Sequence, residues 1–240
     1  MSITMKYSVL IPAHNEEAFL GKCLQSVESA SDQIPEPVEI IVALNRCTDQ
    51  TADIAARHHA AIVNEDSKNL ARIRNAAARA ATGDIMVTID ADSRMSGNMF
   101  VEITENLATG NYIGGGVMIR PERWSLGICM SMLTVLPFLL IQRVSGGLFW
   151  CHRRDFEAVG GFNESLVSAE DLDFAKRLKA YGKTKGKRFK TITSAHIITS
   201  CRKFDTFGDW YLFKNPGLVW KIMKGDNQKA ADLFYYHTDR

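Results

Sequence analysis

Two aspartates one residue apart follow an apolar run near the middle of the chain. The run is Ile85–Ile89, and Asp90 and Asp92 come directly after it. Its β-branched residues and the preceding Gly83 predict a buried strand. Because side chains alternate along a strand, residues two apart point the same way and the two carboxylates can converge. Converging carboxylates repel each other, so the pair favours a hard divalent cation with oxygen ligands.

A turn is the alternative interpretation of the same residues. Asp at a strand end followed by Ser93 is also typical of an ordinary turn or a helix cap. Ligands in an open α/β sheet bind beyond the carboxyl ends of the strands, which is where the aspartates lie. Both interpretations stay open at this point, and the surrounding elements bear on the choice.

The segments before the aspartates alternate between strand and helix patterns. Strands are expected at Tyr7–Ile11, Val38–Val42, Ala61–Val63 and Ile85–Ile89. Helices are expected between them, at Phe19–Val27 with Asn15 as the cap, at Thr48–His59 and at Asn69–Ala81. This alternation predicts a parallel sheet with helices on both faces over roughly the first 110 residues.

The pattern is less regular in the second half of the chain. We expect, in order, a strand at Tyr112–Arg120, an apolar helix at Ile128–Ile141, a strand at Leu148–Cys151, a helix at Phe156–Gly161, a helix at Asp171–Tyr181 and a basic loop at 182–190. The fold class is therefore α/β, in one domain at 1–240. A Rossmann-like nucleotide-binding half with a mostly parallel sheet is expected at 1–110, and a less regular half at 111–240 should cover it.

The composition of the chain bears on its cellular compartment and on the class of its partners. The net charge of +2 over 240 residues does not indicate a nucleic-acid partner. Five scattered cysteines without C-x-x-C spacing, and an N-terminus without a signal-peptide pattern, favour a reducing, cytoplasmic protein. The apolar stretch Ile128–Ile141 is shorter than the ~20 residues of a membrane-spanning helix. It predicts a buried or interfacial helix, with peripheral contact at the inner membrane face as the alternative.

Four blocks in order resemble family 2 glycosyltransferases. They are Ser8–Glu17; Arg74-Asn75 followed by Ala80–Asp84; Asp90-Ala91-Asp92; and Gly160–Asn163 followed by Ala169–Asp173. The resemblance implies a GT-A fold and a nucleotide-sugar donor such as a UDP- or GDP-sugar. It also implies a Mn²⁺ or Mg²⁺ cofactor and inversion at the anomeric carbon of the transferred sugar.

The resemblance assigns the donor side to residues at the strand ends. Asp92 would bind the metal directly, and Asp90 would bind the ribose or a metal-bound water. The remaining donor-binding residues would be Pro12, Ala13, Glu16, Asn45, Arg74 and Ala91. Arg74 would reach the base or a phosphate, with a solvated helix arginine as the alternative. Asn45 stands where the family commonly carries an acidic residue; its amide can still pair with a base edge, whereas Asp49 fits a helix start better.

The resemblance assigns the acceptor side to an acidic pair. Asp171 would be the base that takes the acceptor's proton, with Glu170 as its neighbour. The alternative is structural, because Ser168 and Asp171 also have the spacing of a helix-capping box. His196 would be a further metal ligand or else a structural residue. Arg202-Lys203 and the basic run 183–190 would close over diphosphate or else form solvated surfaces.

Three functions remain in competition. The first is an inverting, metal-dependent glycosyltransferase acting on a saccharide, lipid-linked or small-molecule acceptor. The second is a non-catalytic member of the family that binds a nucleotide sugar. The third, a nucleotidyltransferase, is disfavoured because Pro12–Glu16 lacks the glycine-rich basic loop that would hold a triphosphate.

Overall fold

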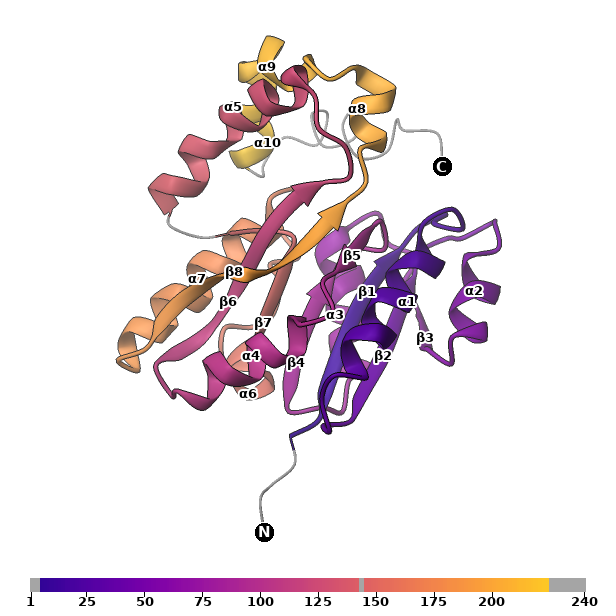
Figure 1. The fold of residues 1–240 in the computed structure, drawn as a ribbon, viewed down its shortest axis with the longest axis vertical. Coiled ribbons are helices and arrows are strands. Elements are labelled where there is room, and N and C mark those ends of the chain that lie inside the picture. The colour runs from indigo at the N-terminus through magenta and orange to yellow at the C-terminus, as the bar shows by residue number, and fades with distance from the viewer. Residues whose placement is uncertain (1–4, 143–144, 225–240) are drawn as a thin grey trace.

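The computed structural model describes residues 5–142 and 145–224. Its strands are β1 (Tyr7–Ala13), β2 (Val38–Leu44), β3 (Ala61–Asn64), β4 (Ile85–Ile89), β5 (Ser93–Met95), β6 (Tyr112–Pro121), β7 (Leu148–His152) and β8 (Arg188–Thr199). Its helices are α1 (Leu20–Ser31), α2 (Thr51–Arg57), α3 (Leu70–Ala80), α4 (Met99–Ala108), α5 (Leu126–Gln142), α6 (Arg153–Ala158), α7 (Glu170–Thr184), α8 (Arg202–Phe207), α9 (Tyr211–Lys214) and α10 (Pro216–Lys224). Figure 1 shows their arrangement.

One sheet runs through the described part of the chain. Its eight strands follow the order β3-β2-β1-β4-β7-β6-β8-β5. Strands β1 to β4 pair in parallel, as their alternation with helices predicts, and β6 also pairs in parallel with β8. Strand β7 is antiparallel to both β4 and β6, so it begins at the edge where β4 ends. The carboxyl ends of β1, β2 and β4 therefore face the start of β7.

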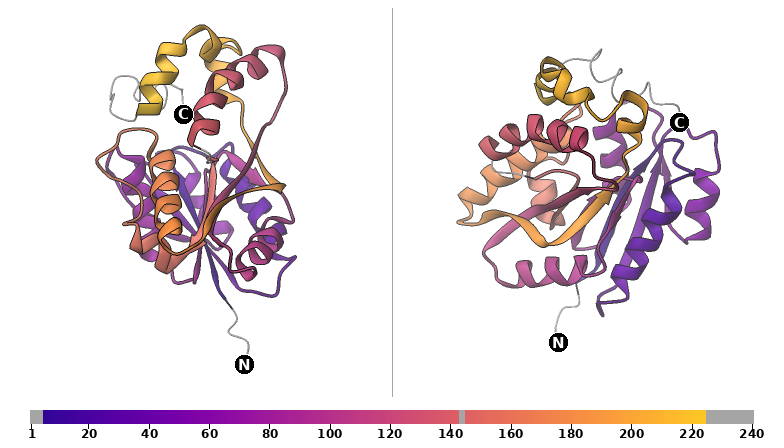
Figure 2. Two further views of the ribbon diagram at one scale, coloured as in Figure 1. Left: turned by 90° about the vertical axis from the view of Figure 1, so that its left-hand side faces the viewer. Right: turned by 45° about the horizontal axis from the view of Figure 1, so that its top comes forward.

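Both faces of the sheet are covered by helices, and the core lies in two layers. Along β1, Val9 and Ile11 pack with α1, α2 and α4, whereas Leu10 packs on the other face with α3, α6 and α7. Figure 2 shows the orange α7 and the magenta α4 on opposite sides of the sheet. Burial on both faces explains why these strands are continuously apolar rather than alternating.

The start of α1 differs from the expectation. Asn15 is not its cap, because α1 begins at Leu20 after Phe19, which makes no side-chain cap bond. Asn15 instead has a positive φ of 49°, and its side chain accepts a hydrogen bond from the Thr48 backbone N–H. Strand β1 also continues through Pro12, at a position beyond its pairing with β4, where a missing N–H removes no bond to that strand.

The basic run at 182–190 is not a loop. Its first residues end α7, and Arg188 begins β8, which pairs along β6 as far as Pro121. The Arg188 and Lys190 side chains lie over the Tyr112 ring, which offsets the low strand propensity of charged residues here. Strand β5 and helix α4 were also not predicted, although Met99, Phe100, Ile103 and Leu107 have helical spacing and are buried.

Helices α5, α8, α9 and α10 lie together beyond the ends of β6 and β8 (Figure 1). Both strands lead directly into this group, β6 into α5 and β8 into α8. Several of its large apolar side chains are exposed, including Trp124, Leu126 and Leu133. Among the described helices, none has the length and apolar content needed to cross a bilayer. We call this group the helical layer.

Candidate active site

A pocket lies at the carboxyl ends of the parallel strands. It is lined by residues after β1, β2, β4 and β8 and by the segments that begin α3 and α7: Pro12, Ala13, His14, Glu16, Asn45, Leu70, Ile73, Asp90, Ala91, Asp92, Val167, Ser168, Glu170, Thr199, Ser200, Arg202 and Lys203. The structure thus brings seven of the expected donor residues to one cavity. Arg74, Asp171 and His196 are outside this lining.

The two aspartates reach the pocket from a turn rather than from the strand itself. Strand β4 ends at Ile89, and the Ser93 backbone N–H closes a turn onto the Asp90 carbonyl. The turn interpretation of the sequence is therefore correct, and the turn also delivers both carboxylates to the cavity. Their partners differ, however, because Asp90 bonds toward α3 and Asp92 bonds toward the end of β8.

Asp92 is held by residues that follow β8. Its Oδ2 accepts a hydrogen bond from the Ser200 hydroxyl at 3.0 Å and lies 3.1 Å from the Arg202 guanidinium. The Ser200 backbone N–H also donates to the Asp92 carbonyl. Arg202 forms a bidentate ion pair with Glu16, at 2.7 and 2.9 Å, and lies over the Phe19 ring. Glu16 is 4% exposed, so Arg202 neutralises a buried carboxylate as well as Asp92.

Asp90 is held by a buried arginine of α3. An Arg74 guanidinium nitrogen lies 2.6 Å from Asp90 Oδ1, and Arg74 Nε lies 3.4 Å from Glu170 Oε1. Arg74 also lies over the Phe162 ring and is 4% exposed. It is therefore neither a solvated helix residue nor a group that lines the cavity. Arg74 connects Asp90, in the turn after β4, to Glu170, at the start of α7.

The acidic pair at the start of α7 is not a capping box. The residue before the helix is Ala169, in the left-handed conformation with a φ of 55°, and it makes no side-chain cap bond. Asp171 Oδ1 accepts the Leu172 backbone N–H, and a Cβ added to Gly146 would lie 3.1 Å from Asp171 Oδ2. Asp171 therefore faces the segment that leads into β7, while Glu170 lines the cavity.

Burial changes the acidity of both carboxyl groups. Burial and the neighbouring Asp171 raise the pKa of Glu170 to about 7, although Arg74 opposes this shift. Burial also raises the pKa of Asp171, again against Arg74. Because the two groups are adjacent, their titrations are coupled. A carboxylate with a raised pKa is a better proton acceptor than an exposed one.

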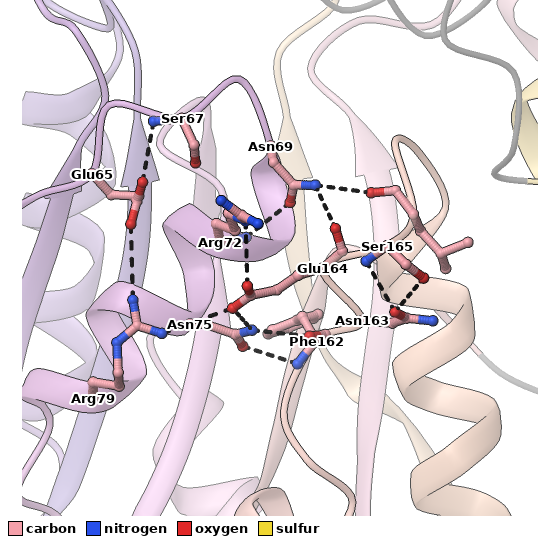
Figure 3. A network of polar contacts seen from close by, with 11 residues as sticks. Glu65, Ser67, Asn69, Arg72, Asn75, Arg79, Phe162, Asn163, Glu164 and Ser165 are labelled. Carbon is pink, nitrogen blue, oxygen red and sulfur yellow. Dashed lines mark hydrogen bonds and ion pairs between the residues drawn. The ribbon is translucent and has the colours of Figure 1, made fainter.

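The segment at 160–166 is fastened to α3 by side chains next to Arg74. Figure 3 shows Asn75 accepting from the Phe162 N–H and donating to the Phe162 carbonyl, both at 2.9 Å. Asn69 donates to the Glu164 carbonyl in the same network, and Arg72 pairs with the Glu164 side chain. Gly161 has a φ of 62°, and a Cβ there would lie 2.7 Å from the Asn75 oxygen. The Arg-Asn and Gly-Gly-Phe blocks therefore meet at this junction.

Asn45 is already engaged within the protein. Its amide nitrogen donates to the Glu65 and Ser67 carbonyls, at 2.5 and 2.8 Å, and its oxygen accepts from Arg46. The side chain is 1% exposed. Both hydrogens of the amide are thus used to hold the turn after β3, so the expected pairing with a base edge would require these bonds to break. Asp49 caps α2 through Thr51, as its position indicated.

His196 does not reach the candidate metal site. It lies on β8 opposite Met118, three residues before Thr199, or about 10 Å along a strand. Its backbone bonds to Ser96, and it is absent from the lining of the cavity. Conversely, Ser200 lies in the site although sequence reasoning did not select it. No pattern around Ser200 indicated this, because its position depends on the pairing of β8 with β5 and β6.

The oxygen donors fit a hard divalent cation that is shared with a ligand. In the described residues, no three His, Cys, Asp or Glu side chains are grouped closely enough to hold a metal by themselves. Mg²⁺ is commonly bound by one or two carboxylates together with substrate phosphates, and Asp92 and Asp90 can supply the protein's part. The Arg202 guanidinium beside Asp92 Oδ2 shows that this carboxylate accommodates a positive group.

Comparison with known proteins identifies the family. The sequence model described as Glycosyl transferase family 2 matches residues 8–157, which include β1 to β4, the aspartate pair and β7. The chain belongs to glycosyltransferase family 2. The first three blocks that resembled this family lie within the matched residues, whereas the block at 160–173 lies beyond them.

Relatives of this family 2 glycosyltransferase show the same fold. The glycosyltransferase Rv0539 of Mycobacterium tuberculosis is 33% identical over 103 residues, which are 43% of this chain and 44% of the relative. The S. aureus protein TarS in complex with UDP has a TM-score of 0.64 at 19% identity, covering 96% of this chain and 69% of TarS. The mannosyltransferase PcManGT of Pyrobaculum calidifontis, in complex with GDP-Man and Mn²⁺, has a TM-score of 0.64 at 20% identity, covering 82% and 57%. These likenesses show a GT-A fold.

Replacing Arg74 tests its role as the shared counter-charge. Arg74→Gln leaves Glu170 buried beside Asp171 without its cation, and we expect a loss of about 3–5 kcal/mol in the free energy of unfolding at pH 8. The folded variant then holds a proton on Glu170 that the unfolded chain releases near pH 4.5. Its stability should therefore fall as pH rises from about 4.5 through 7. Urea unfolding at several pH values measures this.

Arg72→Gln is the matched control, because Arg72 lies on the same helix in an exposed ion pair with Glu164. It should cost no more than about 1 kcal/mol at any pH. Equal losses in the two variants, or a loss in Arg74→Gln that is independent of pH, would contradict the role assigned to Arg74.

Proposed function

We propose that the protein transfers a sugar from a nucleotide-sugar donor, a UDP- or GDP-sugar, to an acceptor hydroxyl with inversion at the anomeric carbon. One observation carries the proposal: Asp90, Asp92 and Glu170 line a single cavity at the carboxyl edge of a GT-A sheet. We assign donor binding to residues 1–110 and acceptor binding to residues 111–240. The alternative of a family member that binds the donor without turnover is separated from this by the assays below.

The donor end of the cavity suits a nucleoside diphosphate with a divalent cation. We assign Asp92 as a direct ligand of Mn²⁺ or Mg²⁺, with Asp90 beside it. When bound, the cation neutralises the charge that develops on the leaving diphosphate. Arg202 and Lys203 line the same end and supply further positive charge for phosphate oxygens. The complexes of PcManGT with GDP-Man and Mn²⁺ and of TarS with UDP support this choice of ligand class.

The acceptor end requires one proton acceptor. We assign this role to Asp171, whose Oδ2 faces Gly146 at the start of the β7 segment. The acceptor oxygen forms a bond to the anomeric carbon as the bond from that carbon to the diphosphate oxygen breaks, and the hydroxyl proton passes to Asp171. Burial raises the pKa of this carboxylate, although Arg74 opposes the shift, and the raised pKa strengthens it as a base.

The helical layer suggests how an acceptor reaches the site. Leu126 is 70% exposed, Trp124 62% and Leu133 53%, and the exposed lysines 214 and 221 lie in the same layer. Apolar side chains beside basic ones suit the surface of an anionic bilayer. We therefore propose peripheral membrane contact and a lipid-linked acceptor, in preference to a free saccharide or small molecule. Unpaired cysteines are consistent with the cytoplasmic side of that membrane.

Metal-dependent donor binding is the first test. UDP or GDP with Mn²⁺ should raise the melting temperature of the native protein, with about 2.7 kcal/mol of stabilisation at 100 times the Kd, and EDTA should remove most of this shift. Asp92→Asn should abolish the Mn²⁺-dependent part. Asp84→Asn, at the opposite end of β4, is the control and should retain it. An unchanged shift in Asp92→Asn would contradict the assignment of the metal ligand.

Turnover is the second test. Asp171→Asn should lower kcat by about 10²–10⁴-fold with little change in donor KM, because only the proton acceptor is removed. Asp173→Asn on the same helix should remain active, since Asp173 pairs with Arg177. In the parent enzyme, kcat/KM should rise with pH as the coupled acids lose their protons, because the pKa of Glu170 is about 7 and that of Asp171 is also raised. Donor binding without transfer to any acceptor, including lipid-linked ones, would favour the non-catalytic alternative.

Vesicle flotation tests the membrane contact. The protein should float with vesicles that contain anionic phospholipid, and this binding should weaken with salt. A Leu126→Gln, Leu133→Gln double variant should float at least several-fold less. Ile62→Gln is the control, because Ile62 is 38% exposed on β3, away from the helical layer. Equal flotation of both variants, or none of the parent protein, would rule out this surface.

A further inference from the structure

Arg202 places its positive charge beside Asp92, where a divalent cation bound to Asp92 would also lie. One guanidinium nitrogen is 3.1 Å from Asp92 Oδ2, and the fork holds both oxygens of Glu16 at 2.7 and 2.9 Å. A cation bound at Asp92 Oδ2 would take the same oxygen and would repel the guanidinium. The guanidinium and the cation therefore compete for Asp92 Oδ2.

The contact with Glu16 is the stronger of the two that Arg202 makes. It is bidentate and largely buried, whereas the contact with Asp92 is single and longer. The Arg202 Nε is buried and makes no hydrogen bond to the described residues. Arg202 thus has a firm attachment at Glu16, a weaker one at Asp92 and a donor N–H that is not used. Because Arg202 Nη2 contacts both Asp92 and Glu16, the guanidinium can lose Asp92 while it keeps both bonds to Glu16.

The polypeptide around Arg202 connects this contact to the helical layer. Ser200 holds Asp92 through two hydrogen bonds, and Arg202 is the first residue of α8. Helix α8 is in turn linked to the segment before α5 by the ion pair between Asp205 and Arg123. A change of partner at Arg202 therefore acts on the residue where β8 passes into the helical layer.

We propose that Arg202 is a built-in substitute for the divalent cation. It neutralises Asp92 and Glu16 while the pocket holds no metal, it competes with the metal for Asp92, and after release it binds the donor's phosphate oxygens. This inference rests on the proposed use of a metal and a nucleotide sugar, and it adds an antagonism between Arg202 and the metal. Removing Arg202 should therefore change metal affinity and nucleotide affinity in opposite directions, whereas general damage to the site would lower both.

Arg202→Gln tests the proposal with two binding measurements. Mn²⁺ binding in the absence of nucleotide, followed by the electron paramagnetic resonance signal of free Mn²⁺, should become about 5- to 50-fold tighter. UDP or GDP binding at saturating Mn²⁺, followed by titration calorimetry, should become weaker by a similar factor. Arg202→Lys keeps the charge but not the fork, so both changes should be smaller. Circular dichroism checks that each variant is folded.

Arg123→Gln is the matched control, because it removes the ion pairs to Asp205 and Asp209 without touching Asp92. It should leave both affinities within about twofold of the parent values. Weaker Mn²⁺ binding in Arg202→Gln, or no change in either affinity, would overturn the role of Arg202 while leaving the proposed function intact. A parent protein that binds neither Mn²⁺ nor a nucleoside diphosphate would overturn the proposed function itself.

Discussion

Charge compensation at one edge of the sheet is the constraint on which the site depends. Four carboxylates, those of Glu16, Asp90, Asp92 and Glu170, line one cavity, and two arginines each pair with two of them. Buried acids without such partners would take up protons or unfold the region, since an unpaired buried charge is strongly destabilising. Each arginine serves one acid on the strand-end turn and a second acid elsewhere. The ion pairs of Arg74 and Arg202 therefore hold the acids that line the cavity in place.

The sheet explains why these acids meet. Strands β1, β2 and β4 run in parallel and end at the same edge, so the residues that follow them are neighbours although they are far apart in sequence. The antiparallel β7 begins at this edge and brings in the segment that faces Asp171. Close packing of β6 requires glycine, because a Cβ on Gly115 would lie 1.8 Å from the Lys190 carbonyl oxygen. Strand β6 can thus pair closely with β8.

Much of the first half could be predicted because its signals are local. Four apolar strands separated by amphipathic segments specify a parallel sheet, and the aspartates after β4 had to lie at its carboxyl edge. The roles of Arg74 and Asn45 could not be predicted, because their partners come from α7 and from the turn after β3. Ser200 enters the site only through the pairing of β8, whose basic beginning has the composition of a loop. Local patterns do not encode such long-range partners.

The cavity has two unequal borders, and one of them is the junction between α3 and residues 160–166. On this side, Asn75 bonds to both polar backbone groups of Phe162, and Arg74 pairs with Asp90 and Glu170. On the other side, the contacts of Ser200 and Arg202 with Asp92 and Glu16 and a short helix border the cavity. Opening the first side would leave several buried polar groups without hydrogen-bond partners, so this side resists separation.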